Sequence, residues 1–201
     1  MRSKKKLKLT LLRHAESEDN LNQCLSGHRD TQLSEKGLWQ AECLKKRFEN
    51  ENFQAIYCSD LSRAKSTILP YTEHQNIKVH FTPLLRERAM GIYEGTEKCT
   101  LAQAQRSMPL GVFKPQGGES LLETQERARL FLGTLMHLHE DGDILICSHG
   151  LFLQLFLTNL LQRELEDAAS FKHDNTGISV IEIIGKKQID PVKINCTAHL
   201  R

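Results

Sequence analysis

Apolar residues in this chain form short runs with the length of β-strands, and segments with a helical repeat of apolar positions separate them. The runs lie at residues 6–12, 54–58, 77–81, 143–147, 177–184 and 189–196. Strands that alternate with helices predict a mostly parallel sheet with helices on both faces. The expected fold class is therefore α/β, a three-layer α/β/α sandwich. A length of 201 residues fits a single domain over residues 1–201.

Capping signals indicate where the first helices begin. Ser34 is a good N-cap, and Leu33 with Leu38 would form a hydrophobic staple across it. The helix that follows has one apolar face, made of Leu38, Ala41, Leu44 and Phe48. Asp60 is the expected cap of the next helix, and Pro70 should kink or end that helix.

Two further helices are expected in the second half of the chain. Ser120-Leu121-Leu122-Glu123 is a capping box that starts a helix reaching about residue 139. The most apolar segment, residues 151–161, falls well short of the roughly 20 residues that span a bilayer. We therefore expect a buried helix there.

Two of the apolar runs end in a histidine. The first run continues into Arg13-His14, and the run at residues 143–147 continues into Ser148-His149-Gly150. The carboxyl ends of parallel strands meet at one edge of a sheet, which is where open α/β folds keep their sites. Paired imidazoles at such an edge favour phosphoryl transfer through a histidine.

Phosphoryl transfer needs a nucleophile, positive charge around the phosphoryl oxygens and a proton donor for the leaving oxygen. His14 is the candidate nucleophile, because a neutral imidazole can attack phosphorus without an activating base. Arg13, Arg63 and His149 would surround the phosphate. Glu87 would protonate the leaving alkoxide and later deprotonate the attacking water.

Each of these residues also has a purely structural interpretation. A histidine at a strand end is more often a hydrogen-bonded structural residue, and Arg63 on a helix is usually solvated or part of a surface ion pair. Arg86 and Arg88 flank Glu87 and would favour its charged form, whereas burial would favour the neutral form that a proton donor needs. The five groups in this order are far more specific than any one of them.

The blocks that hold these groups resemble the histidine phosphatase (phosphoglycerate mutase-like) superfamily over roughly residues 7–185. Leu12-Arg13-His14-Ala15-Glu16-Ser17, through Asn20, is similar to the Arg-His-Gly-Glu signature of that family. The other blocks are Ser26-Gly27 with Leu33-Ser34-Glu35-Lys36-Gly37, Ser59-Asp60-Leu61-Ser62-Arg63-Ala64, Leu85-Arg86-Glu87 through Gly91, and Ser148-His149-Gly150. The resemblance implies a phosphoglycerate mutase-like fold.

The resemblance also implies roles for individual residues. His14 would carry a phosphohistidine, Glu87 would be the acid, and Arg13, Arg63 and His149 would form the phosphate pocket. Two groups of further residues are implied: Asn20 and Gly150 at the phosphate, and Ser26, Gly27, Arg88 and Lys98 at the substrate. Ala15 stands where glycine is usual in the family, and it would be harmful only at a positive φ.

Within the family, a phosphatase and a phosphoglycerate mutase are the main alternatives. The cofactor-dependent mutases carry a longer basic insertion after the block of the acid, whereas here only residues 96–117 follow it, with Lys98, Arg106 and Lys114. The segments at residues 113–120 and 175–177 look more like the phosphatase branch, which includes TIGAR-type fructose-2,6-bisphosphatases and broad-specificity phosphatases. A protein phosphatase is a further alternative, and a binding module without chemistry is less favoured because all five groups are present.

Composition narrows the partners and the location. A net charge of +2 does not favour nucleic acid or a membrane surface, so the expected partner is a small phosphorylated metabolite. The six cysteines include no C-x-x-C pair, which indicates a reducing, cytoplasmic location. The nine histidines include no pair at tight ligand spacing except His137 and His139, which would diverge on a helix. We therefore expect no metal and no cofactor.

Overall fold

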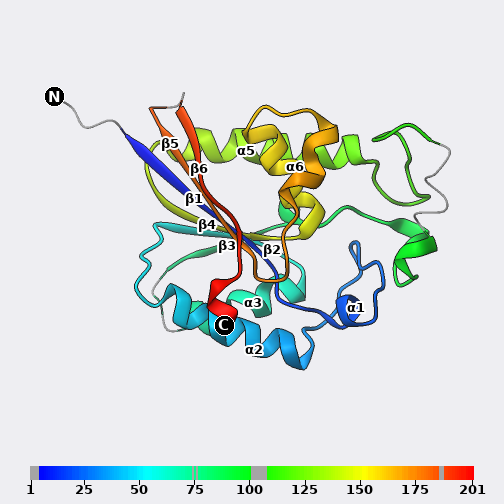
Figure 1. Ribbon diagram of the computed structural model, residues 1–201, viewed down its shortest axis with the longest axis horizontal. Coiled ribbons are helices and arrows are strands. Elements are labelled where there is room, and N and C mark those ends of the chain that lie inside the picture. Colours follow the sequence, from blue (N-terminus) through cyan, green and yellow to red (C-terminus); the bar gives the residue numbers. More distant parts are fainter. Residues whose placement is uncertain (1–4, 74, 76, 101–107, 186–187) are drawn as a thin grey trace.

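The computed structural model describes residues 5–73, 75, 77–100, 108–185 and 188–201 (Figure 1). In that part of the chain, one sheet contains the strands β1 (Lys6–Arg13), β2 (Ala55–Ser59), β3 (Val79–Thr82), β4 (Gly142–Ser148), β5 (Ile178–Ile184) and β6 (Gln188–Cys196). The α-helices described are α1 (Glu18–Leu21), α2 (Glu35–Phe48), α3 (Ser62–Thr72), α5 (Leu121–Leu138) and α6 (Gly150–Leu160). Short 3-10 helices lie at η1 (Pro83–Leu85), η2 (Gly91–Tyr93), η3 (Leu165–Phe171) and η4 (Ala198–Leu200).

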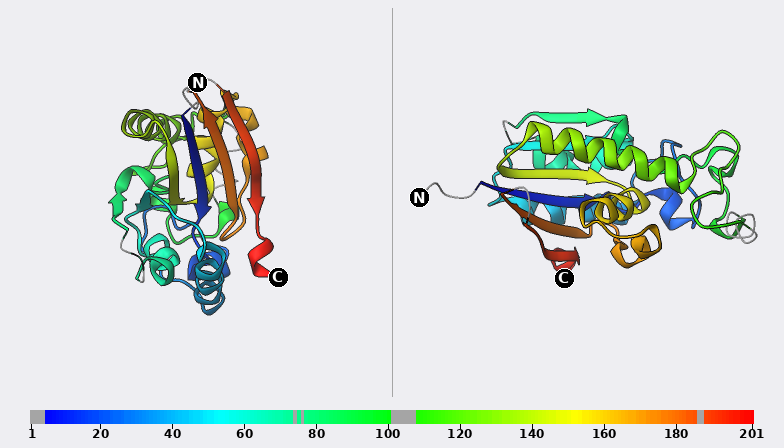
Figure 2. Two further views of the ribbon diagram at one scale, coloured as in Figure 1. Left: turned by 90° about the vertical axis from the view of Figure 1, so that its left-hand side faces the viewer. Right: turned by 90° about the horizontal axis from the view of Figure 1, so that it is seen from above.

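The strands follow the order β3-β2-β4-β1-β5-β6. β3, β2, β4 and β1 are parallel to one another, whereas β5 is antiparallel to both of its neighbours, β1 and β6. Parallel neighbours need crossover connections, and here helices cover both faces: α2 and α3 one face, α5 and α6 the other (Figure 2). The expected three-layer α/β/α sandwich with a mostly parallel sheet is confirmed.

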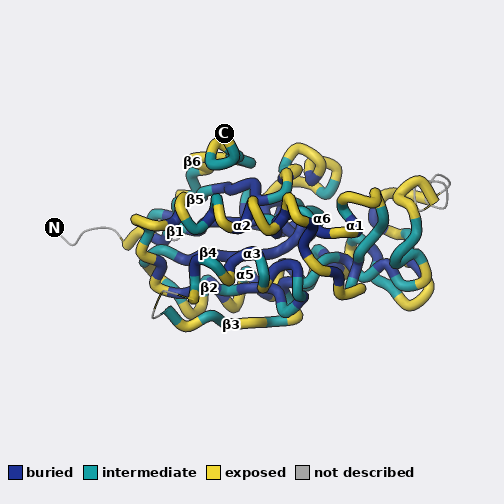
Figure 3. Tube along the Cα trace, turned by 90° about the horizontal axis from the view of Figure 1, so that it is seen from below, coloured by how far each residue is buried: buried dark blue, intermediate teal, exposed yellow. Residues whose placement is uncertain are grey.

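The core is built by the alternation of side chains along the central strands. Leu7 and Leu11 of β1 pack toward α5 and α6, whereas Leu12 packs toward α2 and α3. These central strands form the most deeply buried part of the molecule (Figure 3). Cys58 of β2 and Cys147 of β4 are buried free thiols that face α2 and α3, where they act as small apolar residues.

Two of the predicted helix starts are confirmed by their caps. The Ser34 hydroxyl accepts a hydrogen bond from the Gly37 amide (3.1 Å), and Ser120 forms the expected capping box with Glu123.

The prediction that Leu38 belongs to the buried face of α2 is wrong, since 55% of Leu38 is exposed. Gly37 packs against the backbone carbonyl of Glu16, and Leu38 lies about 100° further round the helix.

The start of α3 differs from the prediction. Its N-cap is Leu61, which has no capping side chain, and the Asp60 carboxylate instead accepts two hydrogen bonds from the Arg86 guanidinium (2.7 and 2.6 Å). This contact joins α3 to a segment 26 residues away, which local sequence does not reveal. Pro70 lies inside the helix, which continues for two residues to Thr72.

The most apolar segment forms α6, which is buried along most of its length, as expected. None of the helices in the described ranges is both long and apolar enough to cross a membrane.

Candidate active site

The two histidines at strand ends come together at one edge of the sheet. β1 and β4 are parallel neighbours with Arg13 opposite Ser148, so His14 and His149 leave their strands side by side. The His14 amide donates to the Ser148 carbonyl (2.9 Å), and the two ring centroids are 5.0 Å apart at 58°. Only 4% of His14 and none of His149 is exposed. The predicted pairing of imidazoles is therefore confirmed.

The backbone determines which nitrogen of His14 is available for chemistry. Nδ1 lies 2.7 Å from the carbonyl oxygen of Ala15, and a carbonyl only accepts, so Nδ1 carries the hydrogen of the neutral ring. Nε2 is then the nitrogen with a free lone pair, in a residue that lines a cavity. Burial, with the charges of Arg63 and Arg13, holds the pKa of His14 well below its ordinary value of 6.5. The ring is therefore neutral at pH 7.

Arg13 and Arg63 bring buried positive charge to the same cavity. Arg13 Nη1 donates to the His173 carbonyl (2.7 Å), and Arg63 donates to the carbonyls of Arg29 (2.9 Å) and Gly27 (2.8 Å). The Nε atom of each arginine is buried without a partner among the described residues. Burial lowers the pKa of both guanidinium groups, although an arginine stays charged at neutral pH. Two charged residues that line the cavity thus keep unused hydrogen-bonding capacity.

Glu87 reaches this edge from the long connection between β3 and α5. Its carboxylate accepts hydrogen bonds from the amides of Leu151 and Phe152 (both 3.1 Å) at the start of α6, and from the amide of Arg88 (3.0 Å). Helix starts leave such amides without partners, so Glu87 supplies the cap that the N-cap residue of α6 lacks.

The two arginines that flank Glu87 in the sequence do not pair with its side chain. The guanidinium of Arg86 bonds to Asp60. Arg88 is 98% buried and donates to the carbonyls of Glu119 (2.7 Å) and Phe113 (2.9 Å). Arg88 is not among the residues that line the cavity of His14, so its position does not support the predicted contact with substrate.

The cavity in front of His14 has a volume of about 120 Å³. It brings together most of the predicted site residues, namely Arg13, His14, Asn20, Ser26, Gly27, Arg63, Glu87 and Lys98. Gly27 needs its left-handed φ of +52°, and a side chain there would collide with Glu94. Gly150 lies behind Arg13, and an added Cβ would approach its Nε to 3.4 Å. Of the other two basic residues in the segment after Glu87, Lys114 pairs with Glu123, and Arg106 lies outside the described residues.

Several lining residues have no sequence signal of their own. Cys24, Leu25, Met90 and Leu151 also line the cavity, and they bring an apolar side to it. They lie in loops or at a helix start, where an apolar side chain resembles any other core residue in the sequence.

Asn175 is a further residue that sequence reasoning assigned no role. Its side-chain amide donates to the carbonyl of His14 (3.1 Å) and to Oδ1 of Asn20 (3.0 Å). Asn20 Oδ1 also accepts from the Ser17 amide (3.3 Å), so the Nδ2 donor of Asn20 is the end left for a ligand. Only the segment at residues 175–177, similar to the phosphatase branch, pointed to this position.

The sequence model of the histidine phosphatase superfamily (branch 1) matches residues 9–197. That range contains all of the site residues above and nearly the whole chain. The chain belongs to the histidine phosphatase superfamily.

Relatives of this histidine phosphatase include named phosphatases. Phosphoserine phosphatase 1 of Hydrogenobacter thermophilus is 31% identical over 200 residues, which cover 96% of this chain and 94% of that protein. An adenosylcobalamin/alpha-ribazole phosphatase of Salmonella typhimurium is 28% identical and covers 88% of this chain and 91% of its own length. The crystal structure of the alpha-ribazole phosphatase from Shigella flexneri has a TM-score of 0.87 and 27% identity, covering 94% of this chain and 96% of that one. The chain is therefore a phosphoric monoester hydrolase of the histidine phosphatase type.

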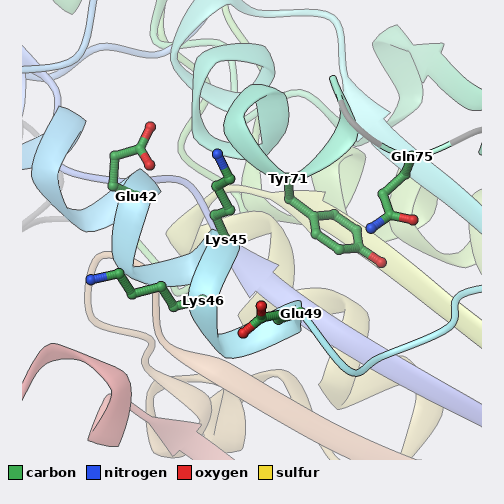
Figure 4. Close-up of a pocket in the computed structure, with 6 residues that line it drawn as sticks. All are labelled: Glu42, Lys45, Lys46, Glu49, Tyr71 and Gln75. Atoms are coloured by element: carbon green, nitrogen blue, oxygen red, sulfur yellow. The ribbon is translucent and has the colours of Figure 1, made fainter.

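The histidine phosphatase has a second hollow of about 340 Å³, along the C-terminal half of α2 and beside α3 (Figure 4). Its lining residues are Glu42, Lys45, Lys46, Glu49, Tyr71 and Gln75. Acidic and basic side chains are mixed there, and none of the residues of the His14 cavity takes part. This hollow therefore lacks both the nucleophile and the net positive charge that phosphoryl transfer needs.

In the described part of the histidine phosphatase, no group of three or more His, Cys, Asp or Glu side chains is arranged to hold a metal ion. The positive charge at the cavity comes from Arg13, Arg63 and Lys98, and a guanidinium group binds phosphate oxygens directly.

The two buried imidazoles make a prediction for stability against pH. Burial is the largest cause that holds the pKa of His14 and of His149 well below 6.5, so the folded protein keeps both rings neutral. In the unfolded chain the rings take up protons as the pH falls through 6.5, which favours unfolding below that pH. We expect urea titrations to give a lower free energy of unfolding at about pH 5.5 than at about pH 7.5. The fall should be smaller in His14→Ala, and an equal fall in both proteins would contradict this account.

The contacts of Asn175 make a second prediction. Asn175→Ala should remove the shorter of the two hydrogen bonds that orient the Asn20 amide, and kcat/KM should fall by up to about tenfold, as expected for weakening one hydrogen bond to a charged ligand. Asn159→Ala is the matched control, because that side chain donates to the Gln125 carbonyl (2.9 Å) within the layer of α5 and α6. The inference about Asn175 fails if both variants keep the wild-type kcat/KM.

Proposed function

We propose that this protein hydrolyses small phosphate monoesters through a phosphohistidine on Nε2 of His14. The observation that carries the proposal is the hydrogen bond between His14 Nδ1 and the Ala15 carbonyl, beside two buried arginines. This bond leaves the Nε2 lone pair for attack on phosphorus. It also stabilises the positive charge that the ring gains when Nε2 becomes phosphorylated.

The phosphoryl group binds among donors that have no other partner. Arg13 Nε, Arg63 Nε and His149 Nδ1 are buried and unpartnered among the described residues, and Asn20 offers its Nδ2 from the cavity wall. A buried polar atom without a partner costs free energy, and a bound phosphate oxygen would remove that cost. The oriented donors also stabilise the charge that develops on the phosphoryl oxygens in the transition state.

In the first step, Nε2 of His14 forms a bond to phosphorus while the bond from phosphorus to the leaving oxygen breaks. The carboxyl group of Glu87 gives its proton to that oxygen, so that the product leaves as a neutral alcohol.

In the second step, the Glu87 carboxylate takes a proton from a water molecule. The water oxygen forms a bond to phosphorus, and the bond between phosphorus and Nε2 breaks. Inorganic phosphate leaves, His14 regains its lone pair and Glu87 is protonated for the next cycle.

The size and lining of the cavity support a small phosphorylated metabolite as the substrate. A volume of about 120 Å³ suits a phosphoryl group with a short leaving group. Lys98 lines the cavity beside the apolar Leu25 and Met90, so that the leaving group meets both a cation and apolar side chains. Phosphoserine and alpha-ribazole phosphate, for which relatives are named, join the sugar phosphates and phosphoglycerates as candidates.

The test is phosphate release by the purified protein in the presence of EDTA. The panel contains p-nitrophenyl phosphate, phosphoserine, alpha-ribazole phosphate, fructose 2,6-bisphosphate, the phosphoglycerates and a phosphopeptide. We expect release from a small monoester without metal, and the ranking identifies the substrate class. No phosphate release from any panel member, together with isomerisation of phosphoglycerates after priming with a bisphosphate, would identify the protein as a mutase and overturn this proposal. The absence of both phosphate release and isomerisation would favour a binding module.

A further inference from the structure

The second histidine of the site contacts a serine that neither the mechanism above nor the sequence analysis uses. Nε2 of His149 lies 2.8 Å from the hydroxyl oxygen of Ser59, and both residues are fully buried. The other ring nitrogen, Nδ1, is buried without a partner among the described residues. His149 is not among the residues that line the cavity, but its ring centroid lies 5.0 Å from that of His14, which does line it. One nitrogen of His149 is therefore bonded to Ser59, and the other has no partner among the described residues.

The register of the sheet brings these two residues together. β2 and β4 are parallel neighbours with Cys58 opposite Cys147, so Ser59 at the end of β2 lies beside the point where β4 runs on to His149. Ser148, the residue before His149, turns its own hydroxyl to the Leu85 carbonyl (2.7 Å) and not to the imidazole. Two buried serines thus flank the end of β4, and only Ser59 touches the ring.

The contacts of the Ser59 hydroxyl determine the direction of its hydrogen bond. Its oxygen accepts a long hydrogen bond from the Leu61 amide (3.4 Å), and the described residues offer its hydrogen no acceptor other than His149 Nε2. The hydroxyl hydrogen has an acceptor only when Nε2 carries a lone pair and no hydrogen. A neutral imidazole with a bare Nε2 carries its hydrogen on Nδ1.

We propose that Ser59 is a positioning residue that holds His149 in the Nδ1–H form, so that a neutral imidazole donates this hydrogen to a phosphoryl oxygen. In the other tautomer, Nδ1 would present a lone pair to the phosphate, and the two would repel each other. Burial, with the charges of Arg63, His14 and Arg13, holds the pKa of His149 well below 6.5. The ring is therefore neutral, and only a neutral ring has two tautomers. The inference rests on the phosphate site of the proposed function.

The first experiment reads the tautomer directly and needs no turnover. Long-range correlations between ring protons and nitrogens, recorded by NMR on the protein labelled with nitrogen-15, distinguish a protonated Nδ1 from a protonated Nε2. We expect His149 in the wild-type protein to have a protonated Nδ1 and a bare Nε2 near pH 7. A signal from the other tautomer, or from a ring with both nitrogens protonated, would overturn the inference.

Three variants then separate positioning from packing. In Ser59→Ala we expect His149 to lose its pure Nδ1–H form, and the Kd of inorganic phosphate to rise by about tenfold or more, because a hydrogen bond to a charged acceptor is worth about that factor. Ser59→Thr keeps the hydroxyl and should keep the wild-type tautomer. Ser148→Ala, the matched control, removes an equally buried hydroxyl and should lower the melting temperature without changing the tautomer.

Phosphate binding by folded Ser59→Ala with the wild-type Kd and an unchanged tautomer would overturn the inference, whatever the turnover assay gives. Failure of the proposed function looks different, because His14→Ala would then retain full phosphate release while the tautomer of His149 remained as expected.

Discussion

Replacing His14 with alanine is expected to abolish turnover and leave the fold intact. The ring contributes Nε2 to the reaction, and its other contacts are the bond to Ala15 and the neighbouring imidazole of His149. The residue follows the end of β1 and lines the cavity, so alanine enlarges the cavity and leaves the apolar side chains of the core in place. We expect less than about 1% of wild-type kcat with every substrate, since removal of a nucleophile costs many orders of magnitude. Phosphate release and thermal melting measure the two effects.

His137→Ala is the matched control for this experiment. His137 lies on the exposed face of α5, away from the cavity, and its loss should change neither activity nor melting temperature. The wild-type enzyme, quenched with base during turnover of a radiolabelled substrate, should carry a label that is stable in base and labile in acid, as a phosphohistidine is. Residual activity of His14→Ala above about 1%, or a label on another residue, would count against His14 as the nucleophile.

Replacing Glu87 with glutamine is expected to affect poor leaving groups far more than good ones. The amides of Leu151 and Phe152 bond to different oxygens of Glu87, so a glutamine of the same shape keeps one of these two hydrogen bonds and loses the other. The amide has no proton to give at neutral pH, so an alkyl phosphate should lose about 10²–10⁴ in kcat/KM, the usual range for a general acid. An activated aryl phosphate leaves without a proton, and its first step should change little.

The comparison uses p-nitrophenyl phosphate and phosphoserine on the same preparation of Glu87→Gln, so that any loss of folded protein affects both substrates equally. Glu42→Gln, an exposed change on α2 outside the cavity of His14, is the control and should behave as wild type. The quantity compared is kcat/KM, which reports the first step, because hydrolysis of the phosphohistidine is common to both substrates. Equal loss of kcat/KM on both substrates would show that Glu87 does not protonate the leaving group.

Much of the architecture could be predicted because its signals are local. Strand-length apolar runs that alternate with capped helices were sufficient for the α/β sandwich, and the caps at Ser34 and Ser120 are where the sequence indicated. The helix face that includes Leu38 was misjudged because the docking of α2 depends on the close approach of Gly37 to the Glu16 carbonyl. The role of Asp60 was misjudged because its partner, Arg86, is distant in the sequence.

For the candidate site, too, the sequence predicted the residues, and the fold decided their contacts. The order of its blocks pointed to His14, Arg63, Glu87 and His149, and the fold brings all four to one edge of the sheet. The sequence offered Arg88 as a substrate contact on equal terms, whereas in the fold its guanidinium bonds to two backbone carbonyls outside the cavity.

By itself, then, the sequence determined the sandwich, the family and the residue types available for phosphoryl transfer, since all of these follow from periodicity and from short blocks in a set order. Only the tertiary structure decided which nitrogen of His14 is free, which donors stay unpartnered, and that Ser59 and Asn175 support the site. The physical reason is that tautomers, burial and hydrogen-bond partners are set by neighbours in space. The partners of His149 and of Asn20 lie 90 and 155 residues away along the chain, whereas His14 bonds to the carbonyl of the next residue, a contact that depends on the backbone conformation at the end of β1.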